Sequence, residues 1–315
     1  MNIDEITRLL TSRGITDDWE ITSAFPLHPM KPIYRFKGDE HDYCVKVIKD
    51  NEKRALQRLV PLNLRHVQRF IAPSLLDKNV LVTEYLPHGT LSELNISPDL
   101  IREYAELQNT FNKKPYIDDL DLDIDENGFL RGDPVNGFYI KAIKPSFEIG
   151  YQNLKQSIAM HNPAFSDECR AIADYIMKHK EAISYEYATM PYAYLHNDFR
   201  VDNISDSDPQ YIIDWGSCWG WGPFIFDVAP VLLNDKRNLQ VYTKTSDICR
   251  ESDSSQIHRW IVVAACARFI YRFRWNTPDL DIDETTRKGL DTIWARMYQY
   301  YTRILEEHLL SGDII

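Results

Sequence analysis

The chain has 315 residues, of which 44% are hydrophobic, and this size indicates a globular protein with more than one substantial core. Its formal net charge of −11 argues against nucleic-acid binding, because nucleic-acid phosphates recruit basic surfaces. Its five cysteines are widely spread and include no C-x-x-C pair, so neither a zinc ribbon nor a disulfide framework is expected.

The amino-terminal residues 1–19 are predicted to form a helix. Ile3, Ile6 and Leu10 recur at helical spacing, and Gly14 is placed to end the helix. The first ten residues are acidic and amphipathic, unlike a signal peptide. A cytoplasmic protein is therefore expected.

Three strands are predicted next, over residues 19–22, 33–36 and 43–48. Period-2 alternation places Lys46 on one face of the third strand, beside apolar neighbours. A lysine facing inward there needs a partner, whereas a lysine at a solvent-facing edge does not, and both arrangements fit the pattern. A helix over 52–59 follows.

A further buried strand begins at Val80 and runs into Glu84, Tyr85 and Leu86 before a proline and a glycine end it at positions 87 and 89. A helix is then predicted to start at Pro98, because a serine in the capping position precedes this proline and an aspartate follows it.

The acidic run 118–126 resembles a calcium-binding loop only at first sight. Three aspartates have the one-three-five spacing, but the sixth position is Glu126 and the twelfth is Gly132, where such a loop needs glycine and glutamate. A solvated acidic loop is expected, and the rim of a site for a cationic substrate is the alternative. Residues 279–284 are similarly acidic.

The most informative stretch follows a predicted helix over 164–184. An apolar run leads to His196 and Asp198, and Asn203 lies five positions after that aspartate. A second apolar run then presents Asp214 at the end of a predicted short strand. This order suits phosphoryl transfer, in which one carboxylate takes a hydroxyl proton while an amide and a second carboxylate hold magnesium. A polar hairpin with scattered acids is the alternative.

Two amphipathic helices are predicted after this stretch, over residues 255–275 and 284–309. The apolar run 260–270 within the first is interrupted by Arg268 and is too short to cross a bilayer, so no membrane association is expected.

The letters HNDFRVDNI, together with IIDWG, resemble the aminoglycoside phosphotransferase and choline kinase group of the protein-kinase-like superfamily. The resemblance covers about residues 20–230. It implies a two-lobed α+β fold, with a nucleotide-binding lobe over 1–87 built on a small five-stranded antiparallel sheet. A larger, mainly helical lobe over 88–315 would carry the catalytic and substrate-binding residues.

The same resemblance implies roles for the residues of the catalytic stretch. Asp198 would be the base that deprotonates the acceptor hydroxyl, and Arg200 would contact the γ-phosphate. Asn203 and Asp214 would bind Mg²⁺. Asp227, at a predicted helix start, would anchor the catalytic loop.

The resemblance also implies a nucleotide site. Lys46 would hold the α- and β-phosphates of ATP or GTP and pair with Glu52, while the backbone of Glu84, Tyr85 and Leu86 would bind the base. In one respect the sequence departs from the superfamily, because the turn over residues 23–32, which would cover the phosphates, contains no glycine.

The implied activity is transfer of the γ-phosphate of ATP or GTP to a hydroxyl of a small acceptor, with an aminoglycoside or another amine-bearing compound as one class that fits. Aromatic side chains such as Tyr271 and Trp275 would then stack on the cation. The alternative is a nucleotide-binding regulatory pseudokinase without turnover. A metal-dependent hydrolase using His196 and Asp198 would need further histidines.

Overall fold

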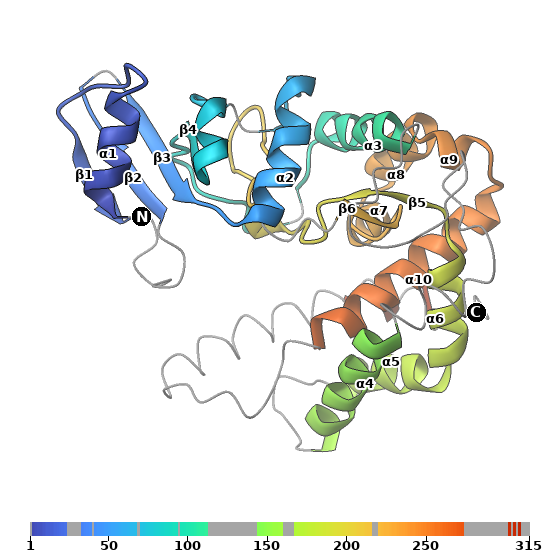
Figure 1. The fold of residues 1–315 in the computed structure, drawn as a ribbon. Coiled ribbons are helices and arrows are strands. Elements are labelled where there is room, and N and C mark those ends of the chain that lie inside the picture. Colours follow the sequence, from blue (N-terminus) through green and yellow to red (C-terminus); the bar gives the residue numbers. More distant parts are fainter. Residues whose placement is uncertain are drawn as a thin grey trace. The chain divides into compact units, whose positions relative to one another are not determined.

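The structure is a computed structural model that describes residues 2–23, 33–39, 41–67, 70–93, 95–112, 144–159, 167–215 and 220–273, with 302–303, 305–306 and 308–309. The chain divides into two compact units, one made of Met1–Glu103 and His196–Trp219, the other of Tyr104–Leu195 and Gly220–Ile315. Figure 1 shows the elements of both. The lobe boundary at residue 87 stays a prediction.

The first unit contains an antiparallel sheet. Its strands follow one another in sequence order: β1 (Glu20–Ser23), β2 (Ile33–Lys37), β3 (Asp42–Val47) and β4 (Val80–Glu84). The described residues give this sheet four strands, where five were predicted. The register pairs Lys46 with Ile33 on one side and Leu81 on the other, so Lys46 lies in the interior of the sheet.

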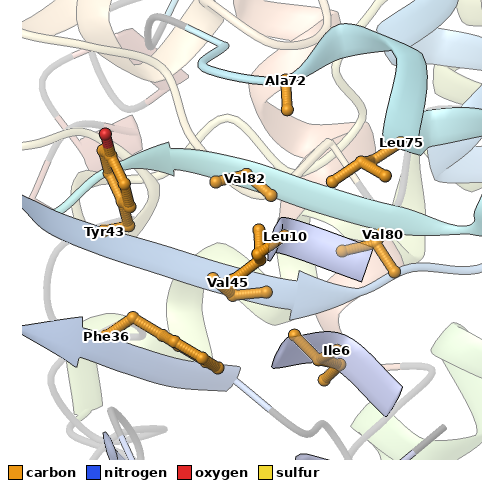
Figure 2. Packing of buried hydrophobic residues seen from close by; sticks show 9 residues of the cluster. All are labelled: Ile6, Leu10, Phe36, Tyr43, Val45, Ala72, Leu75, Val80 and Val82. Carbon is orange, nitrogen blue, oxygen red and sulfur yellow. The ribbon is translucent and has the colours of Figure 1, made fainter. Parts of the chain in front are cut away.

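One face of this sheet packs against helix α1 (Ile3–Thr11). Ile6 and Leu10 are fully buried there, against side chains such as Val45 and Val80. Figure 2 shows the cluster of nine buried residues between α1 and the strands. Asn2 caps α1, accepting a hydrogen bond from the backbone of Glu5 at 2.9 Å, and such a cap stabilises a helix by about 1 kcal/mol.

The opposite face of the sheet carries the functional candidates. Because side chains alternate along a strand, Cys44 and Lys46 point away from α1, and Arg35 shares that face as the register partner of Cys44. Helix α2 (Asp50–Leu59) follows β3, and the short helices η1 (Val60–Leu62) and η2 (Pro73–Lys78) lead to β4.

The second unit is mainly helical, with one two-stranded ladder of β5 (Tyr192–Leu195) and β6 (Gly220–Pro223). The helices with described bounds in its sequence range include α4 (Lys144–Ala159), α5 (Asp167–Lys178), α6 (Lys180–Thr189), α7 (Ala229–Asn234), α8 (Lys236–Thr245), α9 (Asp247–Arg250) and α10 (Ser254–Phe273). Helix α3 (Pro98–Asn112) begins in the range of the first unit. Across the described part of the chain, no helix is long and apolar enough to cross a membrane.

Helix α10 is the centre of the second unit. It contacts α4, α6 and α7, and every residue described from Trp260 to Ile270 is buried, which explains the long apolar run. Helix α4 approaches it closely at Gly150, where an added Cβ atom would lie 2.5 Å from the backbone oxygen of Ile270. Only glycine fits this contact without displacing a backbone.

Arg268 interrupts that apolar run because it has partners. Its Nη1 atom donates to the carbonyl oxygens of Phe226 (3.2 Å) and Asp227 (2.9 Å) and lies 3.5 Å from the Asp227 carboxylate. The Tyr104 hydroxyl donates to the same carboxylate at 2.5 Å. Asp227 therefore holds a buried charged cluster in its own unit, and its implied link to the catalytic loop stays a prediction.

Some sequence predictions differ from the observed elements. The helix predicted over 164–184 is broken at His179, where φ of −104° and ψ of 14° separate α5 from α6. The strand predicted before Asp214 is reduced to single bridges from Ile212 to Val67 and to Ile204. The acidic runs 118–126 and 279–284, the turn over 24–32, the Tyr271 side chain and Trp275 lie outside what the structure describes.

Candidate functional site

Lys46 is held between two carboxylates. Its Nζ atom lies 2.6 Å from Oε1 of Glu52 and 2.6 Å from Oδ1 of Asp214. The side chains of Lys46 and Glu52 are 9% and 5% exposed, whereas that of Asp214 is 31% exposed. The ammonium group is therefore buried with Glu52, and Asp214 forms its more open side.

These partners determine the protonation of Lys46. Burial by itself lowers the pKa of the lysine, but the charges of Glu52 and Asp214 and their hydrogen bonds outweigh it, so the pKa is raised above its ordinary value. Lys46 consequently stays protonated at neutral pH and presents a fixed positive charge on this face of the sheet.

Asp214 is positioned by the backbone of the two residues that precede it. Ile212 bridges to Val67 and to Ile204, and the Ile213 N–H donates to the carbonyl of Asn203 at 2.9 Å. Asp214 itself has φ of 55°, in the left-handed region that aspartate and asparagine adopt more readily than most residues. This turn lets its carboxylate reach Lys46.

The loop from Asp198 to Asn203 is organised by the Asn203 amide. Its Nδ2 atom donates to the Asp198 carbonyl at 2.8 Å and to Oδ2 of the Asp198 carboxylate at 3.1 Å. The backbone N–H of Asn203 also bonds the Arg200 carbonyl at 2.9 Å, within helix η4 (Val201–Asn203). Asn203 therefore orients the carboxylate of Asp198.

Arg200 contacts two carboxylates of the same loop. Its Nε atom lies 3.1 Å from Oδ1 of Asp198, and its Nη2 atom lies 3.0 Å from Oδ2 of Asp202. The Nε contact lacks hydrogen-bond geometry, so it is an ion pair only. Asp202 was not singled out from the sequence, because several carboxylates of this polar loop lie within reach of Arg200.

His196 ties the loop to the segment that carries Asp214. Its ring is buried, and Nδ1 accepts the Asp198 N–H at 3.3 Å, which assigns the ring proton to Nε2. Nε2 then donates to the Ile213 carbonyl at 2.9 Å. Asn197, next to it, has φ of 64°, a second left-handed residue beside the site.

At the end of β4, the backbone N–H of Tyr85 is used by the sheet, because it donates to the Asp42 carbonyl at 2.8 Å. Backbone groups alternate in direction along an antiparallel strand. The carbonyl of Glu84 and the N–H of Leu86 are consequently the groups directed away from β3. Of Glu84, Tyr85 and Leu86, the three residues implied to bind the base and called the hinge below, Tyr85 cannot offer its N–H to a ligand.

The side chain of Tyr85 is fixed by Arg35, whose guanidinium lies 4.1 Å above the ring centre. Arg35 also binds Asp42 through two hydrogen bonds of 2.9 and 2.5 Å. Asp42 and Lys46 are four positions apart on β3, a separation of about 13 Å. The end of β4 therefore lies beside the start of β3, and Lys46 lies near the other end of β3.

Two supporting residues were missed by the sequence analysis. Glu103 accepts the backbone N–H groups of Arg65 (2.8 Å) and His66 (2.5 Å), and the His66 ring bonds the Gln210 carbonyl at 2.7 Å. The His66 carbonyl accepts the Ile212 N–H at 2.8 Å. These contacts are long-range and carry no local sequence pattern, so they were not predictable.

The donor set fits Mg²⁺ rather than a transition metal. Both side-chain bonds that Asn203 makes among the described residues use its nitrogen rather than its amide oxygen, and a backbone bond from Ile213 joins Asn203 to the segment that carries Asp214. Oxygen ligands of this kind, completed by water and phosphate, suit magnesium. Within the described ranges, no group of three or more histidine, cysteine, aspartate or glutamate side chains forms a metal site.

Comparison with solved structures shows the fold. A spectinomycin phosphotransferase bound to AMP is 10% identical, with 98% of this chain and 99% of that chain covered and a TM-score of 0.57. A choline kinase from Cryptosporidium parvum is 11% identical, with 100% and 98% covered and a TM-score of 0.58. The predicted protein-kinase-like α+β fold is confirmed.

Comparison of sequences gives no significant match among curated proteins. A sequence model of the phosphotransferase enzyme family, however, matches residues 33–261, a span that contains Lys46, Asp198, Asn203 and Asp214. The resemblance inferred from the motif is therefore confirmed, and the chain belongs to the phosphotransferase enzyme family.

Proposed function

We propose that the protein is a small-molecule kinase that transfers the γ-phosphate of ATP or GTP to a hydroxyl group. The main observation in support of this proposal is the pair of 2.6 Å contacts that Lys46 makes with Glu52 and Asp214. A lysine that meets both the glutamate of the following helix and the metal-binding aspartate is the arrangement that an active kinase requires.

The nucleotide is expected to lie along the face of the sheet opposite α1. Lys46 binds the α- and β-phosphates, with Glu52 fixing its position. The Glu84 carbonyl and the Leu86 N–H offer an acceptor and a donor to the edge of the purine, which both adenine and guanine can use. Structures of the spectinomycin phosphotransferase with ADP and with AMP support a nucleotide site in this fold.

Asn203 and Asp214 would hold Mg²⁺ through the amide oxygen and the carboxylate. When bound, the ion would offset the negative charge of the triphosphate. The left-handed turn at Asp214 and the backbone bond from Ile213 to Asn203 keep these two residues adjacent before any ligand arrives.

Asp198 acts as the base that orients the acceptor hydroxyl and takes its proton. The Asn203 amide bonds one oxygen of this carboxylate, and the other oxygen faces Arg200. Such a positioned base contributes about 10²- to 10⁴-fold to a rate. Arg200 contacts the γ-phosphate and offsets the charge that develops during its transfer.

The acceptor is a small compound with a hydroxyl group, and an amine-bearing one is the class to test first. One structural neighbour is a complex with spectinomycin and another is a choline kinase. The net charge of −11 favours a cationic acceptor at low salt.

The test is a panel of aminoglycosides, choline-like amines, amino-acid hydroxyls and neutral sugars, assayed for stimulated release of ADP or GDP at several salt concentrations. We expect an amine-bearing compound to be phosphorylated, with a KM that rises with salt. Asp198→Asn should abolish the stimulation while retaining nucleotide binding. Nucleotide binding without release for any acceptor would instead support the regulatory pseudokinase.

A further inference from the structure

Arg200 is shared between two carboxylates that differ in exposure. The Asp198 side chain, which meets its Nε atom, is 16% exposed, whereas the Asp202 side chain, which meets Nη2, is 52% exposed. Both contacts lie on the same edge of the guanidinium, the edge formed by Nε and Nη2. Arg200 itself is 34% exposed.

The other edge of the guanidinium is open. Among the described residues, Nη1 of Arg200 has no hydrogen-bond or ion-pair partner, and Nη2, which carries two protons, meets only Asp202 in an ion pair. An edge with parallel N–H groups matches the oxygens of a phosphate group.

We propose that Asp202 is a positioning residue that keeps this open edge of Arg200 directed at the terminal phosphate of the nucleotide. The proposal rests on the proposed function, since it assumes that Arg200 contacts that phosphate. In this role Asp202 acts through the guanidinium of Arg200, which it contacts at 3.0 Å.

The physical argument is a competition for Nη2. A guanidinium binds a single carboxylate best through two parallel N–H groups. Without Asp202, Nη2 is free to join Nε on Asp198, and this requires the guanidinium to rotate. Asp202 holds Nη2 away from Asp198, so the carboxylate of the base keeps only one contact with Arg200 and the open edge keeps its direction.

A role in stability does not explain Asp202 well. An ion pair whose partners are 34% and 52% exposed contributes little to folding, because water and salt screen it. A direct effect of the Asp202 charge on the nucleotide is also distinguishable, because it would change triphosphate affinity in the opposite direction. Removing a negative charge near a phosphate site favours a triphosphate, whereas losing the position of Arg200 disfavours it.

The experiment measures binding rather than turnover. Dissociation constants for ADP and for a non-hydrolysable ATP analogue, both with Mg²⁺, are determined by calorimetry for the unmodified protein and for Asp202→Asn. We expect the preference for the triphosphate to fall by about tenfold, the order of one hydrogen bond to a charged group, while ADP affinity is unchanged. Asp202→Glu, which keeps the carboxylate, should retain more of the preference.

Two further variants make the result specific. Arg200→Met should lose the same preference, and the double variant should lose no more than either single one, because the two residues act as a unit. Asp206→Asn is the matched control, since Asp206 is an exposed carboxylate of the same loop and makes no ion pair with any residue that the structure describes. Its preference should stay constant or increase slightly.

The outcomes separate the two levels of the argument. If the unmodified protein binds neither nucleotide, the proposed function fails and the role of Asp202 fails with it. If Arg200→Met loses the preference but Asp202→Asn keeps or raises it, the kinase assignment stands and the role of Asp202 is overturned. Equal losses for Asp202→Asn and Asp206→Asn would also overturn it.

Discussion

Lys46 and Asp214 lie 168 positions apart in the chain, yet their side chains form an ion pair of 2.6 Å. The contact depends on the bridge between Val67 and Ile212, which joins the segment of Asp214 to the residues that follow α2. Strand β3 and the catalytic stretch therefore belong to one compact unit, although nearly half the chain separates them.

Lys46→Met should lower both stability and nucleotide affinity. It leaves the buried Glu52 carboxylate without the lysine, and removing one partner of a buried ion pair costs about 3–5 kcal/mol. Urea unfolding measures the stability, and calorimetry with ADP measures the affinity. Adding Glu52→Gln should recover much of the stability but none of the affinity. An unchanged unfolding free energy for Lys46→Met would place the ammonium group in solvent.

Asp214→Asn should reduce kcat by at least about 10²-fold, because a neutral amide holds the metal less well than a carboxylate does. Asparagine accepts the left-handed φ of 55°, so the backbone is retained while the charge that pairs with Lys46 is lost. The measurement is kcat against Mg²⁺ concentration, with Asp206→Asn as the control. Near-normal turnover in Asp214→Asn would exclude Asp214 as a metal ligand.

Cys44 should react slowly with alkylating reagents in the native protein. Burial raises the pKa of its thiol to about 11 from an ordinary value of 9.0, despite the opposing charge of Lys46. At pH 9 the native thiolate is then about 50-fold scarcer than in the unfolded chain, and the reaction rate falls in proportion. Mass mapping of the Cys44 peptide after timed iodoacetamide treatment, with and without urea, measures this ratio.

The raised pKa of Cys44 also makes the stability of the protein depend on pH. Because the folded-state pKa of Cys44 is the higher one, its contribution is fully present below pH 9 and is lost as the pH rises towards 11. The raised pKa of Lys46 acts in the same direction in the alkaline range. Unfolding free energy should therefore fall above pH 9, and a constant value up to pH 11 would contradict both assignments.

Gly150→Ala should destabilise the protein although alanine favours helices by about 1 kcal/mol over glycine. The added methyl group would lie 2.5 Å from the Ile270 carbonyl, so α4 and α10 must move apart, at a cost of about 1–3 kcal/mol beyond that gain. Urea unfolding measures the difference, with Glu148→Ala on the exposed face of α4 as the control. A stabilised Gly150→Ala would show that the helices do not touch there.

The sequence was most informative where chemistry and local pattern coincide. The order of His196, Asp198, Asn203 and Asp214 predicted the family, whereas strand alternation left Lys46 either facing inward or at a solvent-facing edge, and the structure shows it buried within the sheet. The family and the fold are confirmed. The roles of these residues and of the hinge stay predictions.

Other features depend on contacts that no local pattern encodes. The break between α5 and α6 at His179 has neither glycine nor proline to mark it. In the sequence Arg268 only interrupts an apolar run, and its partners, Asp227 and the Phe226 carbonyl, are visible only in the structure. The link from Arg200 to Asp202 is local, but on a polar loop the sequence does not say which carboxylate an arginine will choose.

The two left-handed residues beside the site affect how a saturation mutagenesis screen would be interpreted. At position 214 the screen would combine loss of a carboxylate with loss of a permitted backbone angle. At position 197 it would report the backbone strongly, because φ of 64° favours asparagine, aspartate and glycine and excludes β-branched residues. A position 197 that tolerates few substitutions could then be mistaken for a catalytic residue. Asn197→Gly separates the two effects, because glycine keeps the left-handed backbone and removes the side chain.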